Sequence, residues 1–211
     1  MIKEAMLYEK LDDRQTRCHL CAHRCLIKPD RKGVCGVREN KDGVLYSLVY
    51  ATLIAEHIDP IEKKPFFHVY PASRSYSIAT VGCNFSCDFC QNHEISQMPR
   101  SSLMIPGEDI PPEEIVDQAK KSGCKTISYT YTEPTIYFEF AYDTARMACE
   151  NGLKNLFVTN GFMTAETIDT MASYLAAANV DLKSFRDEFY KKRCGARPNP
   201  VLDSLKRMKE K

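Results

Sequence analysis

The sequence predicts an α/β fold in which parallel strands alternate with helices. From residue 75 onward, short apolar or β-rich runs alternate with longer segments whose apolar residues recur at helical spacing. Prolines open several of the helical segments and glycines close them, as is typical of helix starts and stops. Because parallel strands are joined by right-handed helical crossovers, such a series forms an open doubly wound sheet, a barrel or a partial barrel.

The first half of the series contains two strands and two helices. SYSIATVG (75–82) is a short apolar run that ends in Gly, and it predicts a buried strand. The segment 111–123 predicts a helix, because it starts with two prolines and two glutamates and stops at Gly123. TISYTY (126–131) is rich in β-forming residues and predicts the next strand, whereas 134–152 has the apolar spacing of a helix.

The second half repeats this pattern. NLFVTNG (155–161) predicts a strand, 164–179 a helix and VDLKSF (180–185) a fourth strand. The final segment, 199–211, predicts a helix with Asn199 as its N-cap. A series that ends on a helix leaves the fourth strand at an edge of the sheet, so we expect a chain that is truncated at its C-terminus.

Charge and hydropathy exclude several classes of function. Lys and Arg together number 29 and Asp and Glu 28, so the formal net charge is +1 and no basic surface for nucleic acid is predicted. No apolar run reaches the roughly 18 residues of a membrane span. The charged start MIKEAMLYEKLDDRQ lacks the apolar core of a signal peptide. We therefore expect no nucleic acid partner, no membrane association and a cytoplasmic location.

A cluster of cysteines directly follows the strand predicted over 75–82. Cys83, Cys87 and Cys90 are spaced C-x3-C-x2-C, and no fourth cysteine follows nearby. Structural zinc prefers four ligands, although His93 lies three residues beyond Cys90. Three thiolates suit a cubane iron-sulfur cluster in which one iron stays open to an external ligand. The loop also lies at the carboxyl end of a strand, where βα folds place their chemistry.

This spacing resembles the CxxxCxxC signature of the radical S-adenosylmethionine superfamily, and Phe89 fits the aromatic position before the last cysteine. In that superfamily the amino and carboxylate groups of S-adenosylmethionine chelate the open iron. One electron from the cluster then cleaves the sulfonium to give methionine and a 5′-deoxyadenosyl radical. The resemblance implies a partial βα-barrel, a 4Fe-4S cluster with S-adenosylmethionine as cofactors, and an electron donor such as ferredoxin or flavodoxin. It makes the three cysteines both catalytic and metal-binding.

Later motifs resemble other parts of the superfamily's cofactor site. TYTEP is similar to the motif usually written GGEP, with Glu133 at the acidic position that holds the substrate amino group and Tyr131 and Thr132 in place of the glycines. TNGF and DLK resemble the corresponding strand ends of pyruvate formate-lyase activating enzymes. These matches imply a set of cofactor-binding residues: Phe89, Asn92, Thr132, Glu133, Thr159, Asn160, Asp181 and Lys183.

The narrowest resemblance covers nearly the whole chain. Residues 46–97, and most specifically the stretches HIDPIEKKPFFH and CQNHEIS, resemble the AmmeMemoRadiSam system radical enzymes, which are relatives of the formate-lyase activases. This resemblance implies Memo-like and AMMECR1-like partners. It also implies further C-terminal strands with a glycine-rich motif for the ribose or adenine. On its residues alone, the charged part of HIDPIEKKPFFH, which contains Lys63 and Lys64, is equally well explained as a solvated connector.

A second cysteine cluster lies near the N-terminus. Cys18, Cys21, Cys25 and Cys35 are spaced C-x2-C-x3-C-x9-C. Four thiolates satisfy a structural zinc ion, and they equally satisfy an auxiliary iron-sulfur cluster. We favour zinc, because neither an open position nor a redox role is required there, and we expect the four sulfurs to converge on one tetrahedral site.

These observations predict three regions and one reaction class. We expect a Cys-rich metal-binding module over 1–45, a connector over 46–74 and a truncated radical core over 75–211. The predicted reaction is hydrogen abstraction by a 5′-deoxyadenosyl radical from an unassigned substrate. The alternatives are a non-catalytic iron-sulfur- or zinc-binding partner protein and an inactive fragment. The remaining three cysteines are expected to be small buried hydrophobic residues, namely Cys124, Cys149 and Cys194.

Overall fold

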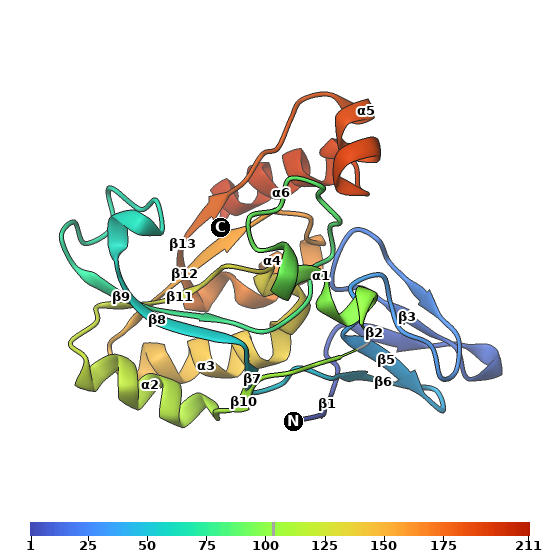
Figure 1. The fold of residues 1–211 in the computed structure, drawn as a ribbon, viewed down its shortest axis with the longest axis horizontal. Coiled ribbons are helices and arrows are strands. Elements are labelled where there is room, and N and C mark those ends of the chain that lie inside the picture. The colour runs from blue at the N-terminus through green and yellow to red at the C-terminus, as the bar shows by residue number, and fades with distance from the viewer. Residues whose placement is uncertain (103) are drawn as a thin grey trace.

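The computed structural model describes residues 1–102 and 104–211. Within these ranges the chain is built around a central sheet of five strands in the order β13-β12-β11-β9-β8 (Figure 1). Four of the strands run parallel, whereas β8 is antiparallel to β9. The predicted α/β class is confirmed. The five strands are β8 (Ala55–Pro60), β9 (Arg74–Ala79), β11 (Thr126–Tyr129), β12 (Lys154–Thr159) and β13 (Leu175–Val180).

Helices connect the parallel strands and cover one face of the sheet. Figure 1 shows α2 and α3 lying along this face. Their apolar sides pack against Ile78, Ile127 and Tyr129, so that helices and strands share one buried core. No helix among the described residues has the length and hydropathy needed to cross a membrane. The helices are α1 (His93–Ser101), α2 (Pro112–Lys121), α3 (Phe138–Glu150), α4 (Ala165–Met171), α5 (Asp187–Phe189) and α6 (Pro198–Glu210).

The loop that joins β8 to β9, residues 61–73, covers part of the opposite face of the sheet. Ile61 and Phe66 on this loop are buried against Leu156 of β12 and form a small second core. Because β8 is antiparallel to β9, this loop lies at the amino ends of the parallel strands. The loop folds back along the face of the sheet, so that Lys63 and Lys64 line the same cavity as the polar residues at the carboxyl ends of the strands.

The N-terminal strands share the core of the central sheet. Leu20, Val37 and Leu45 are buried in the same cluster as Ile127 and Tyr129. The N-terminal region therefore does not have a separate core of its own. Its strands are β1 (Lys3–Glu4), β2 (Tyr8–Lys10), β3 (Thr16–Cys18), β4 (Leu26–Ile27), β5 (Arg38–Lys41), β6 (Val44–Ser47) and β7 (Thr52–Leu53), and β7 pairs with β10 (Glu108–Asp109).

A buried ion pair joins the N-terminal strands to α3. Nη1 of Arg38 donates to both carboxylate oxygens of Glu139, at 2.9 and 3.0 Å, and Nη2 donates to the carbonyl of Met6 at 2.8 Å. The two charged side chains are 2% and 0% exposed. Burial disfavours the charge of Arg38, but Glu139 outweighs this effect and raises the pKa of the guanidinium.

The structure corrects the prediction at the end of the βα series. The strands and helices predicted over 75–82, 111–123, 126–131, 134–152 and 155–161 are present with slightly different bounds, and the last helix begins at Pro198 rather than at Asn199. The helix predicted over 164–179 is too long, and the strand predicted over 180–185 is wrong.

The fourth parallel strand is instead Leu175–Val180, which pairs with β12 and forms an edge of the sheet. Its sequence LAAANV favours a helix by local propensity. Strand pairing at the edge of the sheet satisfies its backbone groups and overrides that preference.

Breaking the Arg38–Glu139 pair should destabilise the whole chain. Arg38→Met leaves the Glu139 carboxylate buried without its counter-charge, so we expect the free energy of unfolding to fall by about 3 to 5 kcal/mol. Urea denaturation followed by circular dichroism measures this change. The matched control is Arg24→Met, which breaks a half-exposed pair with Glu166 at 2.9 Å and should cost about 1 kcal/mol or less. Equal losses in the two variants would contradict the prediction.

Candidate active site

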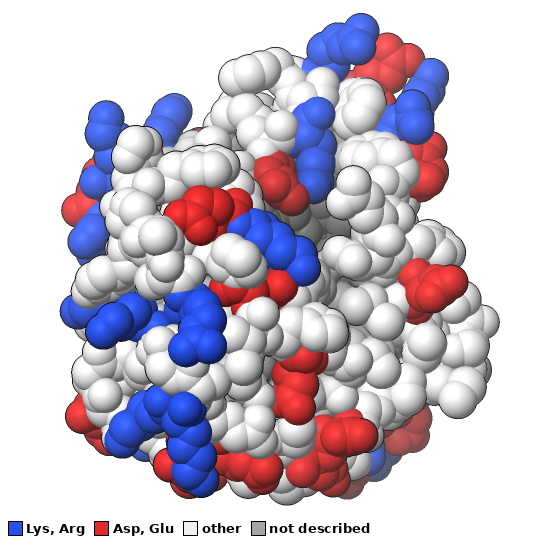
Figure 2. Space-filling view, turned by 60° about the vertical axis from the view of Figure 1, so that its left-hand side comes forward, with Lys and Arg blue, Asp and Glu red and all other residues white. Residues whose placement is uncertain are grey.

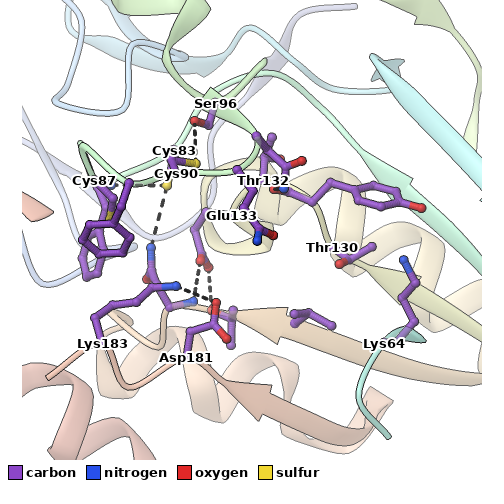
Figure 3. A pocket seen from close by; sticks show the side chains of 18 of the residues that line it. Lys64, Cys83, Cys87, Cys90, Ser96, Thr130, Thr132, Glu133, Asp181 and Lys183 are labelled. Atoms are coloured by element: carbon purple, nitrogen blue, oxygen red, sulfur yellow. Dashed lines mark hydrogen bonds and ion pairs between the residues drawn. The ribbon is translucent and has the colours of Figure 1, made fainter. Parts of the chain in front are cut away.

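A cavity of about 650 Å³ lies at the carboxyl ends of β9, β11, β12 and β13 (Figure 3). The face of the molecule drawn in Figure 2 contains a hollow, and acidic and basic side chains are interspersed over this face. The cavity brings together all the ligands and cofactor contacts that the sequence predicts after residue 80. These residues are Cys83, Cys87, Phe89, Cys90, Asn92, Thr132, Glu133, Thr159, Asn160, Asp181 and Lys183.

The three thiols of the loop after β9 occupy one wall of the cavity (Figure 3). The backbone N–H of Phe85 donates to the sulfur of Cys83 at 3.4 Å, and Nδ2 of Asn160 donates to it at 3.8 Å. The sulfur of Cys90 lies 3.4 Å from the hydroxyl of Ser96. Donors aimed at sulfur stabilise a thiolate, so this wall is suited to cysteines that act as metal ligands.

The spacing of the thiols suits a cluster better than a single ion. Among the described residues, no three His, Cys, Asp or Glu side chains are arranged to hold one metal ion. In a cubane cluster each cysteine binds a different iron, so three ligands need not converge on one point. All three thiols also face a cavity that is large enough for a cluster together with a small molecule.

Burial keeps two thiols of this wall, those of Cys83 and Cys87, protonated in the metal-free chain. Burial, and after it the charge of Glu133, raises the pKa of the Cys83 thiol. Burial and the neighbouring thiol of Cys194 raise the pKa of Cys87 to about 12. Metal binding must therefore displace protons from these sulfurs.

Cys194 is a neighbour of the site that the sequence does not reveal. It is fully buried and lies within hydrogen-bonding reach of the Cys87 thiol. The chain around it also holds the cysteine loop in place. The carbonyl of Cys194 accepts a hydrogen bond from the N–H of Ser86 at 2.9 Å, and the carbonyl of Arg193 accepts one from the N–H of Asp88 at 3.1 Å. Its spacing from the other cysteines gives no signal, since more than one hundred residues separate it from Cys87.

Glu133 connects the ends of two strands through its carboxylate. One oxygen accepts from the N–H of Thr135 at 3.0 Å, from the Thr135 hydroxyl at 2.5 Å and from the Thr159 hydroxyl at 2.7 Å. The other oxygen accepts from the N–H of Asn160 at 2.8 Å, and the side chain of Asn160 donates to Asn84 at 2.7 Å. Burial outweighs these hydrogen bonds and raises the pKa of Glu133.

Asp181 and Lys183 form an ion pair on the side of the cavity that follows β13. Nζ of Lys183 is 2.7 Å from the carboxylate of Asp181. Burial opposes the charge of Lys183, but Asp181 and the nearby thiol of Cys87 raise its pKa above the usual value. A permanent positive charge therefore lies beside the thiol wall, where it lowers the cost of gathering thiolates.

The other predicted cofactor contacts differ in how free they are to bind a ligand. Phe89 is 41% exposed, so its ring is available. Nδ2 of Asn92 donates to the carbonyl of Tyr131 at 2.7 Å, and the hydroxyl of Thr132 donates to the carbonyl of Thr80 at 2.7 Å. The last two side chains hold the loops after β9 and β11 together as well as lining the cavity.

The four N-terminal cysteines line a second, much smaller cavity. Its volume is about 10 Å³, and Arg38 lines it beside Cys18, Cys21, Cys25 and Cys35. This is room for about one water molecule. Nε of Arg38 is buried and has no acceptor among the described residues, although the guanidinium lies close enough to Cys18 and Cys35 to interact with their charge. As at the first cysteine loop, no three of these side chains are arranged to hold one ion in the described residues, so binding one ion would require the sulfurs to move together. The small volume and the buried cation favour one ion over a larger group.

The raised pKa of Glu133 predicts a distinct pH dependence of stability. As the pH rises above the usual value of 4.5, this residue ionises more readily in the unfolded chain than in the folded chain, so the free energy of unfolding falls until the folded pKa is passed. Glu133→Gln removes this titration. We expect the free energy of unfolding of the native chain minus that of the variant to decrease between about pH 4 and about pH 7, as measured by urea denaturation.

Glu166→Gln provides a control of opposite sign. Partial burial opposes the charge of Glu166, but backbone and Arg24 hydrogen bonds lower its pKa. The free energy of unfolding of the native chain minus that of Glu166→Gln should therefore increase as the pH rises from about pH 3 to about pH 5. A flat profile for Glu133→Gln would show that burial does not govern this carboxyl group.

Comparison with known proteins agrees with this site. The sequence model described as the Radical SAM superfamily matches residues 77–211. An uncharacterised protein of Methanocaldococcus jannaschii is 48% identical over 209 residues, which are 99% of this chain and 61% of that protein. A probable GTP 3′,8-cyclase of Methanosarcina acetivorans is 30% identical over 156 residues, which are 70% of this chain and 45% of that protein.

Among solved structures, TYW1 with a lysine-pyruvate adduct bound is similar with a TM-score of 0.49 and 17% identity, over 70% of this chain and 56% of that one. The chain spans about half of the length of the curated relatives that it matches. The family match contains the three thiols and all eight predicted cofactor contacts. This chain therefore belongs to the radical SAM superfamily.

Proposed function

We propose that this chain binds a 4Fe-4S cluster through Cys83, Cys87 and Cys90 and cleaves S-adenosylmethionine reductively. The observation that carries the proposal is that the three thiols and eight cofactor-side residues line one cavity at the carboxyl ends of four parallel strands. When bound, the cluster supplies the electron that splits the sulfonium into methionine and a 5′-deoxyadenosyl radical, which abstracts hydrogen from a substrate.

The protein's own contribution is to position charged and hydrogen-bonding groups around the cavity. Hydrogen-bond donors from Phe85 and Asn160 and the positive charge of Lys183 stabilise the thiol wall. Asp181, the ion-pair partner of Lys183, is 47% exposed. Its carboxylate can accept hydrogen bonds from ribose hydroxyls or pair with an ammonium group. Glu133 is buried at the cavity wall and gives the site a fixed negative charge when it is ionised.

The finer assignment rests on motifs in the sequence. HIDPIEKKPFFH and CQNHEIS support an AmmeMemoRadiSam-type enzyme, related to the activating enzymes of pyruvate formate-lyase and built on a partial βα-barrel. On this proposal the protein works in the cytoplasm, ferredoxin or flavodoxin supplies the electron, and Memo-like and AMMECR1-like proteins are partners. Within residues 1–102 and 104–211, β13 pairs with a strand on one side only, and further strands could add to the sheet at its other side.

Release of 5′-deoxyadenosine tests the proposed function directly. We expect the chain, reconstituted anaerobically with iron and sulfide, to hold about four iron atoms at the three thiols and to release 5′-deoxyadenosine when S-adenosylmethionine and dithionite are added. Addition of S-adenosylmethionine should also change the electron paramagnetic resonance spectrum of the reduced cluster. Cys87→Ala should lose the cluster and the product, whereas Cys149→Ala, which lies outside both cysteine clusters, should keep both. A fully loaded native chain that releases no product would support a non-catalytic partner protein or an inactive fragment.

For the N-terminal cysteines we propose a single tetrahedral zinc ion. The cavity of about 10 Å³ leaves too little room for a cubane cluster, whereas a single ion requires only that the four sulfurs move to within about 2.3 Å of it. Arg38 offsets part of the negative charge of four thiolates. The ion would hold together the loops that precede β4 and β5, and so contribute to stability rather than to turnover.

Metal affinity at this site should rise with pH. Burial raises the pKa of Cys21, Cys25 and Cys35, the last to about 11, so binding must release protons that become easier to remove as the pH increases. Co²⁺ titration measures this through thiolate-to-cobalt absorption, and we expect the affinity to increase at least tenfold between about pH 6 and about pH 8.

The matched variants for this titration separate the two cysteine clusters. Cys83→Ser, Cys87→Ser and Cys90→Ser together remove the competing thiols and should leave the cobalt spectrum unchanged. In that background Cys35→Ser should weaken binding by on the order of tenfold or more, and Cys149→Ser should have no effect. An affinity that does not depend on pH would contradict buried, protonated thiols.

A further inference from the structure

The cavity has a second charged wall opposite the three thiols (Figure 3). Lys64, on the loop between β8 and β9, is 3% exposed and still lines the cavity. Its ammonium lies 2.7 Å from the carboxylate of Asp59 and 4.1 Å above the ring of Tyr131. The hydroxyl of Tyr131 donates to the same carboxylate at 2.5 Å. We call Asp59, Lys63, Lys64 and Tyr131 the lysine wall.

The lysine wall has an excess of positive charge. Lys63 pairs with the second oxygen of Asp59 at 2.7 Å, so two ammonium groups share one carboxylate and one positive charge remains. An ammonium group has three N–H donors, and Asp59 is the one acceptor that the described residues offer to Lys64. Burial lowers the pKa of Lys64 although Asp59 opposes this shift. An anion in the cavity would meet unused donors and would relieve the cost of burying this charge.

Strain in the backbone of Tyr131 points to the same place. Its φ of 61° lies in the left-handed region, which is unfavourable for a residue that has a side chain. A glycine would adopt this conformation freely, but it would remove the ring that lies under Lys64 and the hydroxyl that holds Asp59. The fold therefore keeps a strained tyrosine where the side chain orients the lysine.

We propose that the lysine wall is a substrate subsite that binds an oxyanion, a carboxylate or a phosphate, with Lys64 in contact with the anion and Asp59 and Tyr131 as positioning residues. This inference rests on the proposed function, because it assigns the thiol wall to the cluster and its cofactor and leaves the opposite wall to the substrate. A substrate held there by its anionic group would present its neighbouring carbon atoms toward the thiol wall.

Binding of simple anions tests the subsite without any turnover. The probes are ¹³C-labelled acetate and inorganic phosphate, titrated by NMR into the metal-free chain. We expect saturable binding in the native chain, a loss of on the order of tenfold or more in Lys64→Met, and recovery of most of the affinity in Lys64→Arg. The matched control is Lys120→Met, which removes an exposed lysine of α2 that pairs with Asn151, and it should bind as the native chain does. Native affinity in Lys64→Met would overturn the inference.

A second variant guards against a folding defect. Lys64→Met leaves Asp59 buried with only Lys63 as counter-charge, so Asp59→Asn with Lys64→Met removes the unpaired carboxylate. If this double variant unfolds cooperatively and still binds either probe with native affinity, the inference is wrong. Tyr131→Phe should weaken binding less than Lys64→Met does, since the ring stays in place and only the bond to Asp59 is lost.

Competition with S-adenosylmethionine identifies the source of the anion. This competition uses the cluster-loaded chain, because S-adenosylmethionine chelates the open iron of the cluster. If acetate or phosphate binds unchanged there in the presence of saturating S-adenosylmethionine, the subsite belongs to a separate substrate, and the tighter of the two probes identifies its anionic group. If S-adenosylmethionine displaces both probes in direct competition, the wall binds the cofactor's own carboxylate and the inference is overturned. Failure of the native chain to release 5′-deoxyadenosine would instead count against the proposed function, because the anion titration does not depend on a cluster.

Discussion

The carboxylate of Glu133 determines how the strand ends around the cavity are arranged. It receives four hydrogen bonds, from Thr135, which follows β11, and from Thr159 and Asn160 at the end of β12. Asn160 extends this connection, because its side chain reaches Asn84 and the sulfur of Cys83 in the loop after β9. A single buried acceptor thus links the ends of three adjacent strands. Water could not replace it without opening the sheet.

The N-terminal strands and the central sheet depend on each other in a similar way. Arg38 occupies three roles at once: it pairs with Glu139 of α3, bonds the carbonyl of Met6 and lines the cavity of the four cysteines. The apolar residues of both parts belong to one core. Metal at the four cysteines would therefore support the position of α3 as well as the loops that hold it.

The sequence predicts the cysteines, Glu133 and Asn160 of the cavity well because they lie at the ends of strands that the sequence pattern reveals. Cys83 directly follows the predicted strand 75–82, Glu133 lies two residues past the predicted strand 126–131, and Asn160 lies near the end of the predicted strand 155–161. The carboxyl ends of neighbouring parallel strands meet at one edge of a sheet. The motifs and the strand order therefore both reflect the position of these residues at the carboxyl ends of parallel strands.

Features set by long-range contacts are predicted poorly or not at all. LAAANV becomes an edge strand because β12 offers it backbone partners, which no local pattern in that segment announces. β8 is the antiparallel edge of the sheet, and its alternation is hidden by the charged residues of HIDPIEKKPFFH. Lys64 and Cys194 acquire their surroundings only when distant segments pack, so spacing along the chain gives no indication of either.

The position of the β8–β9 hairpin has a consequence for how such a protein can change over evolutionary time or be re-engineered. Residues 55–79 form one continuous piece, whose loop carries Lys63 and Lys64 at one end of the cavity and whose second strand leads directly into the cysteine loop at the other. The loop packs on the sheet through only a few apolar side chains. Exchanging residues 61–73 for a loop of different length and charge would change which ligands the cavity can bind and would leave the three thiols in their original positions. On the proposed function, the loop that contributes to substrate choice can be exchanged separately from the residues that hold the cluster.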